Sequence, residues 1–261
     1  MITAASNSRI KRLVQLNQKS KLRRTEDVFL AEGVKMFLEA PREQLQEVYV
    51  SESFLEKCSC REHLEEVGYE VVSDSVFSKI SDTCTPQGVL CVLKQFHYNI
   101  EEMLRDKAPL FLLLENIQDP GNLGTMLRTG EGAGVSGIIM SRDTVDLYNP
   151  KVIRSTMGSI YRVPFYYADD FAAAVHQVQR VGVSVYAAHL RGKNSYACQD
   201  YTKGTAFLIG NEGNGLREET AELADCYIRI PMEGKVESLN AAVASSILMY
   251  EAHRQRATIE K

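Results

Sequence analysis

The sequence lacks the features that mark membrane, secreted and metal-binding proteins. No segment reaches the roughly 20 apolar residues that a helix needs to span a bilayer, and MITAASNSRIKRL at the start has no apolar core of a secretory signal. The six cysteines are scattered, and the lone C-x-C of Cys58 and Cys60 has no second pair at zinc spacing. We therefore expect a cytoplasmic protein with reduced thiols, no metal site and no membrane span.

Motifs that bind nucleotide phosphates are also missing. No G-K-[ST] occurs, which argues against the phosphate loop of nucleoside triphosphatases. No G-x-G-x-x-G lies between an expected strand and the start of a helix, and the cluster GEGAG at 130–134 falls where glycine ordinarily ends a helix. No acidic residue is placed to bind a ribose about 20 residues beyond such a loop. A dinucleotide cofactor is therefore disfavoured.

The composition is that of an ordinary globular protein. Of the 261 residues, 44% are hydrophobic and 25% are charged, which is enough apolar surface for one large domain or two small ones. The net charge of −4 argues mildly against nucleic acid as a partner.

The distribution of charge argues the other way. Residues 1–25 contain no Asp or Glu and carry seven cations. The seven are Arg9, Lys11, Arg12, Lys19, Lys21, Arg23 and Arg24. Such a cluster can form a phosphate-binding patch on an otherwise acidic protein. A solvated basic helix followed by a turn is the alternative, and charge alone leaves both open.

The pattern of apolar residues divides the chain into two halves. Residues 1–98 alternate short strand and helix patterns, as in a small α/β domain. Residues 99–108 are polar and precede Pro109, so we expect a linker there. Residues 109–261 alternate apolar strand runs with helices, which is typical of a parallel sheet covered on both faces. The expected fold class is α/β throughout.

Three loops in the second half follow expected strands, at 116–124, 210–215 and 231–240. Ligands of open α/β sheets bind beyond these strand ends. The loops are rich in glycine, which lets backbone groups approach a ligand closely. Their polar side chains each have an ordinary explanation: Asn122 and Ser238 as helix N-caps, and Glu212 as a turn residue. Together the three loops indicate a binding site.

Three segments of these loops carry a family resemblance. They are Asn116 with DPGNLG (119–124) and Arg128, then LIGNEG (208–213), then IPM (230–232) with VESLNAAV (236–243). In this order and spacing they resemble the SpoU (TrmH) family of RNA ribose 2′-O-methyltransferases, in the SPOUT superfamily. The match covers roughly 109–256, and FLAEGVKMFLEA (29–40) with QGVLCVL (87–93) resembles the L30e-like substrate-binding domain that precedes it in some members.

The resemblance implies a knotted fold and a cofactor. The catalytic domain of this family is a parallel α/β sheet with a trefoil knot, and its members are usually homodimers with the C-terminal helix at the interface. An apolar stripe on that helix fits either an interface or the core, and comprises Leu239, Val243, Ile247 and Tyr250. The cofactor is S-adenosylmethionine, and the resemblance assigns its binding to Gly210, Ile230 and Leu239 through their backbone and to Met232 by packing.

The resemblance also assigns the chemistry. Arg128 is the central catalytic position, and a free guanidinium is effectively always protonated. We therefore expect Arg128 to hold the target phosphate and orient the ribose 2′-hydroxyl. Glu212 is the more ordinary base, or else positions Arg128. Asn122, Ser238 and Asn240 fill the other polar positions, and the last two are expected to orient Arg128 or the ribose.

The basic segment and the additional domain favour 23S ribosomal RNA as the substrate, by analogy with the members that they resemble. The residues expected to bind RNA are Arg9, Lys11, Arg12, Lys21, Arg23 and Arg24. Three alternatives remain at this point: a transfer RNA methyltransferase, a non-catalytic RNA-binding protein with the same fold, and an unrelated α/β enzyme acting on a small molecule.

Overall fold

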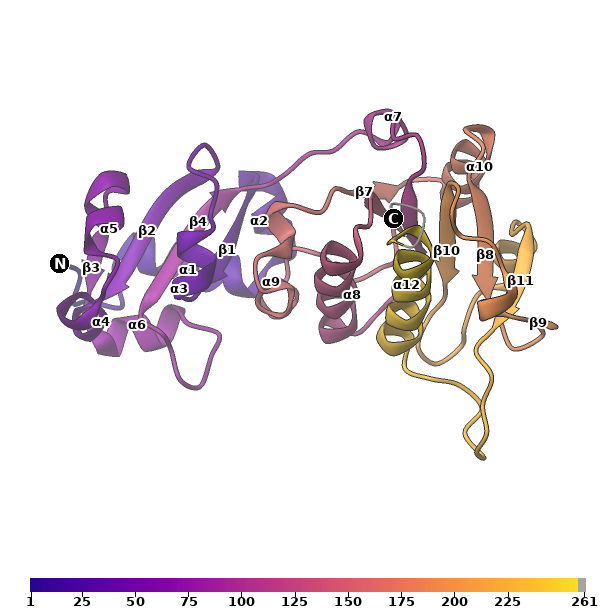
Figure 1. Ribbon diagram of the computed structural model, residues 1–261. Coiled ribbons are helices and arrows are strands. Elements are labelled where there is room, and N and C mark those ends of the chain that lie inside the picture. The colour runs from indigo at the N-terminus through magenta and orange to yellow at the C-terminus, as the bar shows by residue number, and fades with distance from the viewer. Residues whose placement is uncertain (258–261) are drawn as a thin grey trace. The chain divides into compact units, whose positions relative to one another are not determined.

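The computed structural model describes residues 1–257, which form two compact units (Figure 1). The N-terminal unit comprises residues 1–96 and 146–161. The C-terminal unit comprises residues 97–145 and the chain from 162 onward. The chain therefore leaves the N-terminal unit, enters the C-terminal unit and returns once.

The N-terminal unit is built on a mixed four-stranded sheet in the order β1-β4-β2-β3. The strands are β1 (Val28–Glu32), β2 (Leu45–Ser51), β3 (Glu70–Val72) and β4 (Val89–Lys94). Strands β1 and β2 run antiparallel to β4, and β3 runs parallel to β2. The helices are α1 (Ser8–Gln18), α2 (Ser20–Glu26), α3 (Val34–Leu38), α4 (Glu52–Lys57), α5 (Arg61–Val67), α6 (Asp74–Ile80), α9 (Pro150–Thr156) and the 3-10 turn η1 (Ser159–Tyr161).

Helix α1 shows how the sequence pattern produces this unit. Asn7 caps the helix, since its side chain accepts a hydrogen bond from the Arg9 backbone N–H at 2.9 Å. Ile10, Leu13 and Leu16 recur on one face and are buried in the core of the unit. Helices α4 and α5 are separate, because Cys58 adopts an extended backbone between them.

Arg23 joins the returning segment 146–161 to the rest of the N-terminal unit. Its side chain is only 3% exposed. The guanidinium donates to the carbonyl oxygens of Leu16 and Asn17 at 2.7 and 3.1 Å, and to the Asp146 carboxylate at 2.5 Å. Buried charges of this kind are stable only when paired and hydrogen-bonded. Arg23 is therefore a structural residue, and the burial and pairing of its guanidinium argue against its expected role in RNA binding.

The expected boundaries differ from the observed units in two places. Segment 146–161 lies within the expected second domain but packs with the N-terminal unit, where the Tyr148 hydroxyl donates to the Phe96 carbonyl at 3.0 Å. Within the expected linker 99–108, the short helix α7 (Ile100–Met103) buries Ile100 and Met103 in the core of the C-terminal unit. Part of the expected linker is therefore packed structure.

The C-terminal unit contains a seven-stranded sheet in the order β7-β6-β5-β10-β8-β11-β9, and every pairing in it is parallel. The strands are β5 (Leu110–Leu114), β6 (Gly137–Ser141), β7 (Phe165–Ala168), β8 (Ser184–Ala188), β9 (Asn194–Ser195), β10 (Thr205–Ile209) and β11 (Cys226–Arg229). The helices beside α7 are α8 (Pro120–Ala133), α10 (Phe171–Arg180), α11 (Glu218–Ala221), α12 (Ala241–Ala257) and the 3-10 turn η2 (Tyr196–Cys198). The expected parallel α/β sheet is confirmed.

The strand order decides which loops meet. Strands β5 and β10 are neighbours at the middle of the sheet although they lie far apart in the sequence. The loops that follow them, 116–124 and 210–215, therefore emerge side by side at one edge. None of the helices within residues 1–257 is long and apolar enough to cross a membrane.

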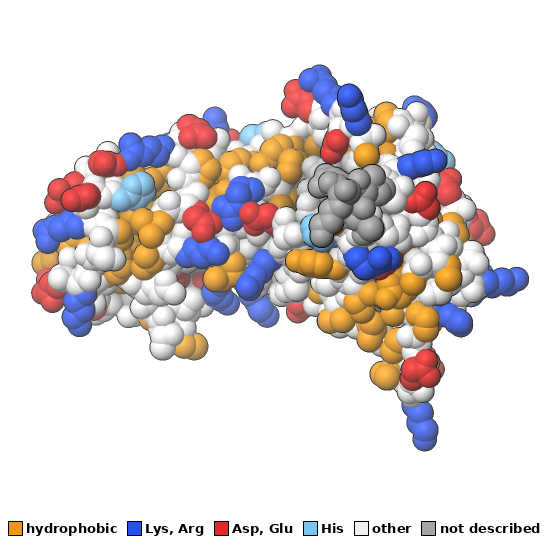
Figure 2. Space-filling view, viewed as in Figure 1, with side chains coloured by type: hydrophobic (Ala, Val, Ile, Leu, Met, Phe, Trp, Pro, Cys, Tyr) orange, Lys and Arg blue, Asp and Glu red, His pale blue; other side chains and the backbone are white. Residues whose placement is uncertain are grey.

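Helix α12 packs beside α8 against the centre of the same sheet (Figure 1). Its apolar stripe is not core in the single chain, because Val243 and Tyr250 are 48% and 49% exposed. Leu239 and Ile247 are partly buried. Hydrophobic side chains gather on the surface over α12 and the segment that precedes it (Figure 2). The stripe is thus available for contact with another surface.

We expect Arg23→Ala to lower the free energy of unfolding by about 3 kcal/mol, because it leaves the Asp146 carboxylate and two carbonyl groups without their buried donor. Chemical denaturation of the purified variant measures this change. Arg24→Ala removes the adjacent, exposed arginine and should leave stability unchanged. Equal stability of the two variants would contradict the structural role of Arg23.

Candidate active site

The first loop ends at the N-cap of helix α8, which is not the residue expected from the sequence. Asp119, not Asn122, caps α8, since the Asp119 carboxylate accepts from the Asn122 backbone N–H at 2.8 Å. Pro120 occupies the first helical position, where its missing N–H costs nothing. Asn122 therefore lies in the first turn of the helix, and its side-chain amide is free to bond elsewhere.

Glu212 of the second loop binds the first loop through three donors. Its carboxylate accepts from the backbone N–H groups of Gln118 and Asp119 at 3.1 and 3.0 Å. It also accepts from the Asn122 side-chain amide at 3.0 Å. These donors belong to the unpaired backbone and side-chain groups at the start of α8, where a negative charge is favourable.

Asn240 of the third loop completes the connection. Its side-chain amide donates to the Asn122 Oδ1 at 3.0 Å. Its own Oδ1 accepts from the backbone N–H groups of Ala242 and Val243 at 2.9 and 3.3 Å. Asn240 therefore caps α12, and Ser238, which lies outside the helix, does not. Glu212, Asn122 and Asn240 form one hydrogen-bonded chain across all three loops, which we call the amide–carboxylate chain.

The electrostatic setting of Glu212 disfavours its use as a base. Partial burial acts to raise the pKa of Glu212, but the hydrogen bonds from Asn122, Asp119 and Gln118 outweigh it, so the pKa lies below its ordinary value. A carboxylate whose pKa is lowered and whose oxygens already accept three bonds is a weak proton acceptor near neutral pH. The geometry favours the other role expected for Glu212, that of a positioning residue.

The second loop is closed by its own backbone and by Asn211. The Asn211 Oδ1 accepts from the backbone N–H groups of Gly213 and Asn214 at 2.9 and 3.0 Å. At Gly210, a Cβ atom would lie 2.2 Å from backbone atoms of Gly215 and Leu216. Only glycine fits at 210, because that contact is with backbone that cannot move aside.

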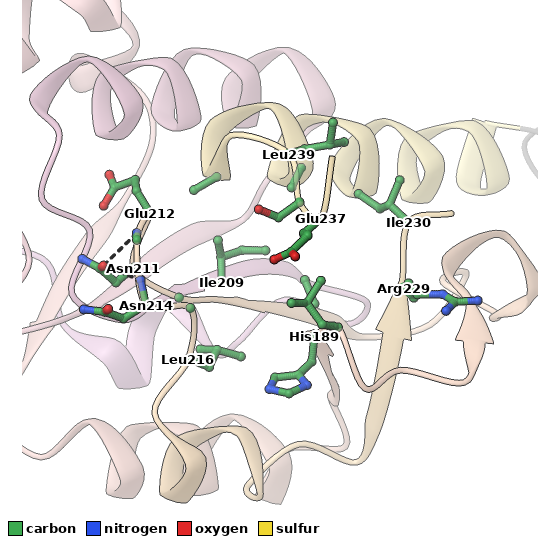
Figure 3. Close-up of a pocket in the computed structure, with 18 of the residues that line it drawn as sticks. His189, Ile209, Asn211, Glu212, Asn214, Leu216, Arg229, Ile230, Glu237 and Leu239 are labelled. Carbon is green, nitrogen blue, oxygen red and sulfur yellow. Dashed lines mark hydrogen bonds between the residues drawn. The ribbon is translucent and has the colours of Figure 1, made fainter. Parts of the chain in front are cut away.

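A cavity of about 310 Å³ lies beside the amide–carboxylate chain (Figure 3). This volume is at the small end of the usual range for ligand pockets, roughly 300–1,000 Å³. All four residues expected to bind the cofactor line it, namely Gly210, Ile230, Met232 and Leu239. Ile209, Leu216 and Ile228 give it an apolar wall. Backbone groups of the glycine-rich second loop form another side.

Three titratable residues at the cavity, His189, Arg229 and Glu237, were not among the expected site residues. His189 follows β8, and the Arg191 backbone N–H donates to its Nδ1 at 3.1 Å. Partial burial and the positive charge of Arg191 lower the pKa of His189, against the opposite effect of Glu218. Glu237 lies in the third loop, next to Ser238. The position of His189 after a parallel strand was a usable signal, because loops at that edge face the same site.

Arg128 lies apart from the cavity. It is exposed on α8, and within residues 1–257 its side chain forms no hydrogen bond or ion pair. Ser238 lines the cavity, whereas the Asn240 side chain is engaged by Asn122 and by the start of α12. The structure therefore brings Asn122, Glu212 and Asn240 together and leaves the Arg128 guanidinium free toward solvent.

The expected basic patch is smaller than the sequence indicates. Arg9 pairs with Glu70 at 3.0 Å, and Arg12 pairs with Glu26 and Glu47 at 2.7 Å each. On the face of the N-terminal unit shown in Figure 2, basic and acidic side chains are interspersed. Three of the expected cations are exposed and form no ion pair within the described residues, namely Lys11, Lys21 and Arg24.

The groups of the site contain no arrangement for a metal. Among residues 1–257, no cluster of three or more His, Cys, Asp or Glu side chains is placed to hold a metal ion.

We expect the stability contributed by Glu212 to depend on pH. Its folded-state pKa lies below the ordinary value of 4.5, so the contribution is present above about pH 4.5 and is lost as the pH falls through the folded-state pKa. Denaturant unfolding should show Glu212→Gln less stable than the wild type at pH 7, with the difference shrinking in acid. Glu233→Gln, in the third loop, is the control; a difference that grew in acid would contradict the assignment.

Comparisons with known proteins agree with this geometry. The model of the SpoU rRNA Methylase family matches residues 109–250, and the model of the MRM3-like substrate binding domain matches residues 7–91. The sequence is 32% identical to 23S rRNA (guanosine(2553)-2′-O)-methyltransferase RlmP of Bacillus subtilis (strain 168), over 252 residues that cover 95% of this chain and 97% of that protein.

Solved structures extend the similarity to the whole fold. An AdoMet-bound rRNA methyltransferase from Sinorhizobium meliloti superposes with a TM-score of 0.84 at 32% identity, covering 97% of each chain. The SpoU methyltransferase AviRb from Streptomyces viridochromogenes, in complex with AdoMet, superposes with a TM-score of 0.87 at 26% identity, covering 97% of this chain and 99% of that one. The expected resemblance is confirmed, and the chain belongs to the SpoU rRNA methylase family.

Proposed function

We propose that this protein transfers the methyl group of S-adenosylmethionine to a ribose 2′-hydroxyl of RNA, and that its substrate is 23S ribosomal RNA. The observation that carries the proposal is the cavity lined by Gly210, Ile230, Met232 and Leu239, beside the amide–carboxylate chain. The whole-length similarity to a relative named as a 23S rRNA 2′-O-methyltransferase supports the choice of substrate.

The chemistry of the cavity fits this cofactor. Ile209, Leu216 and Ile228 give it an apolar wall, the glycine-rich second loop lines another side, and no lysine of residues 1–257 lines it. Arg229 lines it, but its side chain points away from Glu237 and Leu239 (Figure 3). Such a pocket suits a nucleoside without phosphates. When bound, S-adenosylmethionine would supply a methyl group on a sulfonium centre, which is a good leaving group, so that the methyl itself needs little activation.

The side chains of the site then have distinct tasks. Glu212, Asn122 and Asn240 hold the three loops in register and so fix the shape of the cavity. Arg128, whose guanidinium is free, holds the phosphate next to the target ribose and orients its 2′-hydroxyl. Ser238 lies at the cavity wall, where it orients the ribose. Glu212 is disfavoured as the acceptor of the hydroxyl proton, because it already accepts three hydrogen bonds and these lower its pKa.

The N-terminal unit binds the RNA in this proposal. Residues 1–98 form the substrate-binding domain, 99–108 connect it to the methyltransferase domain at 109–261, and segment 146–161 contributes to the N-terminal packing. Lys11, Lys21 and Arg24 provide exposed positive charge for phosphates. Arg9 and Arg12 contribute less, because acidic neighbours already neutralise them. Because the proposed substrate is ribosomal RNA, we expect the protein in the cytoplasm.

The C-terminal helix supports a homodimer and a knotted chain. After β11 the chain returns through 230–240, and α12 packs against α8 near β5 and β10 at the centre of the sheet, as the trefoil knot of the family requires. Val243 and Tyr250 remain exposed on α12 and suit a second copy of the same helix.

The reaction is tested by mapping ribose 2′-O-methylation across total RNA from a strain lacking the gene and from its parent. We expect one site in 23S rRNA to lose its methyl group. Loss of a site in transfer RNA instead would assign the alternative substrate. Loss of no site in either RNA would contradict the proposal.

We expect Arg128→Ala to reduce methyl transfer by about 100-fold or more, because the ribose is no longer held in line with the methyl group. Cofactor binding should persist, since Arg128 does not line the cavity. Transfer of labelled methyl groups to RNA and calorimetric titration of the cofactor measure the two effects. Arg180→Ala on α10 is the matched surface control. Loss of cofactor binding by the Arg128 variant would contradict the assignment.

We expect light scattering to give twice the 29.3 kDa mass of one chain. Tyr250→Asp should shift the protein toward monomers, because it places a charge in the apolar stripe. Val181→Asp changes an exposed valine after α10 and should leave the dimer intact. A monomeric wild type would exclude the dimer.

A further inference from the structure

Glu237 presents a free carboxylate to the cavity. Its side chain lies over the cavity, between Leu239 and His189 (Figure 3). Within residues 1–257 it forms no hydrogen bond or ion pair. Among residues 1–257 the other acid that lines the cavity is Glu212, whose carboxylate already accepts three hydrogen bonds. Glu237 is therefore the acid at the cavity that is able to bind a ligand.

The nearby cationic residues do not neutralise Glu237. The Arg191 guanidinium is paired with Glu218 at 2.5 Å. The Arg229 side chain points away from Glu237 in Figure 3. Burial and Arg191 lower the pKa of His189, which keeps its ring neutral near pH 7. Lys235 lies in the same loop but does not line the cavity. An unpaired carboxylate at the cavity attracts a ligand that carries positive charge.

An ionised carboxylate only accepts hydrogen bonds, so its partner must be a donor. S-adenosylmethionine offers the ribose hydroxyls, which are neutral, and the α-ammonium group of its methionine part. It also carries a sulfonium, which is a cation without a hydrogen-bond donor. A bond to the ammonium adds the attraction between two full charges to the hydrogen bond, which a neutral ribose hydroxyl does not offer, and this favours the cation over the ribose.

The course of the reaction separates the two cations. The sulfonium loses its charge during methyl transfer, so a carboxylate beside it would stabilise the ground state more than the transition state and slow the reaction. The α-ammonium keeps its charge throughout, and a carboxylate bound to it does not oppose the transfer. Building on the proposed function, we propose that Glu237 binds the α-ammonium group of the cofactor and thereby selects ligands that carry the complete amino-acid part.

Calorimetric titration of wild type and Glu237→Gln with three ligands tests this assignment. The ligands are S-adenosylmethionine, S-adenosylhomocysteine and 5′-methylthioadenosine, of which the last has the ribose but no amino-acid part. We expect the variant to bind the first two about tenfold more weakly, by similar factors. Binding of 5′-methylthioadenosine should be unchanged. Glu233→Gln removes an acid from the same loop outside the cavity and should bind all three as the wild type does.

Each other pattern overturns the proposal. Weaker binding of all three ligands would assign Glu237 to the ribose, and weaker binding of S-adenosylmethionine alone would assign it to the sulfonium. Unchanged binding would show that Glu237 contacts none of these groups. Because Glu237 is exposed and unbonded in the described chain, the melting temperature of the variant should equal that of the wild type. A wild-type protein that binds no S-adenosylmethionine would instead contradict the proposed function.

Discussion

The site depends on one interaction, the acceptance of three hydrogen bonds by Glu212 at the start of α8. Loops that carry so many glycines have little shape of their own, because glycine loses more conformational freedom on ordering than any other residue. The carboxylate holds the second loop against the first, and Asn122 passes the constraint to Asn240 and so to α12. A pocket that binds mainly through backbone groups needs that backbone held still. Side chains that bind one another across the loops therefore determine the shape of the pocket.

The charged side chains described above are of two kinds: those that are bound by other groups of the protein, and those that are not. Arg23 and Glu212 are each bound by several groups of the protein, and both hold segments together. Arg128 and Glu237 have no partner within the described residues, and both lie where a substrate or cofactor can reach them. The two free groups carry opposite charges, as a site that handles an anionic RNA and a cationic cofactor requires. Whether a charged side chain is bound by its neighbours, more than its residue type, therefore distinguishes the structural charged residues from the functional ones.

Sequence reasoning succeeded where short-range pattern determines the outcome. Apolar runs such as LFLLL (110–114) identified the parallel strands, and the rule that ligands bind beyond their carboxyl ends led to the three loops. Sequence reasoning failed where the environment of a residue depends on partners far away in the sequence. The partner of Arg23 is Asp146, 123 positions away, so the local basic pattern of 1–25 gave no sign that this arginine is buried. The caps of α8 and α12 shifted by a few residues because Asp119 and Asn240 compete with Asn122 and Ser238 as cap residues. Glu237 was overlooked because no pattern distinguishes a free carboxylate from a surface one.

The return of 146–161 to the N-terminal unit affects the order in which the chain can fold during synthesis. Domains generally fold as they emerge, with N-terminal parts first. Here the sheet of the N-terminal unit is complete at Lys94, yet the buried Arg23 guanidinium must wait for Asp146. Strands β5 and β6 leave the ribosome in that interval, before β10, the other neighbour of β5, exists. The nascent protein therefore holds two incomplete units at once, with a buried charge in one and an unpaired central strand edge in the other. This connectivity therefore requires that the intermediates be protected during synthesis, for example by chaperones. Two units arranged one after the other along the chain would not require it.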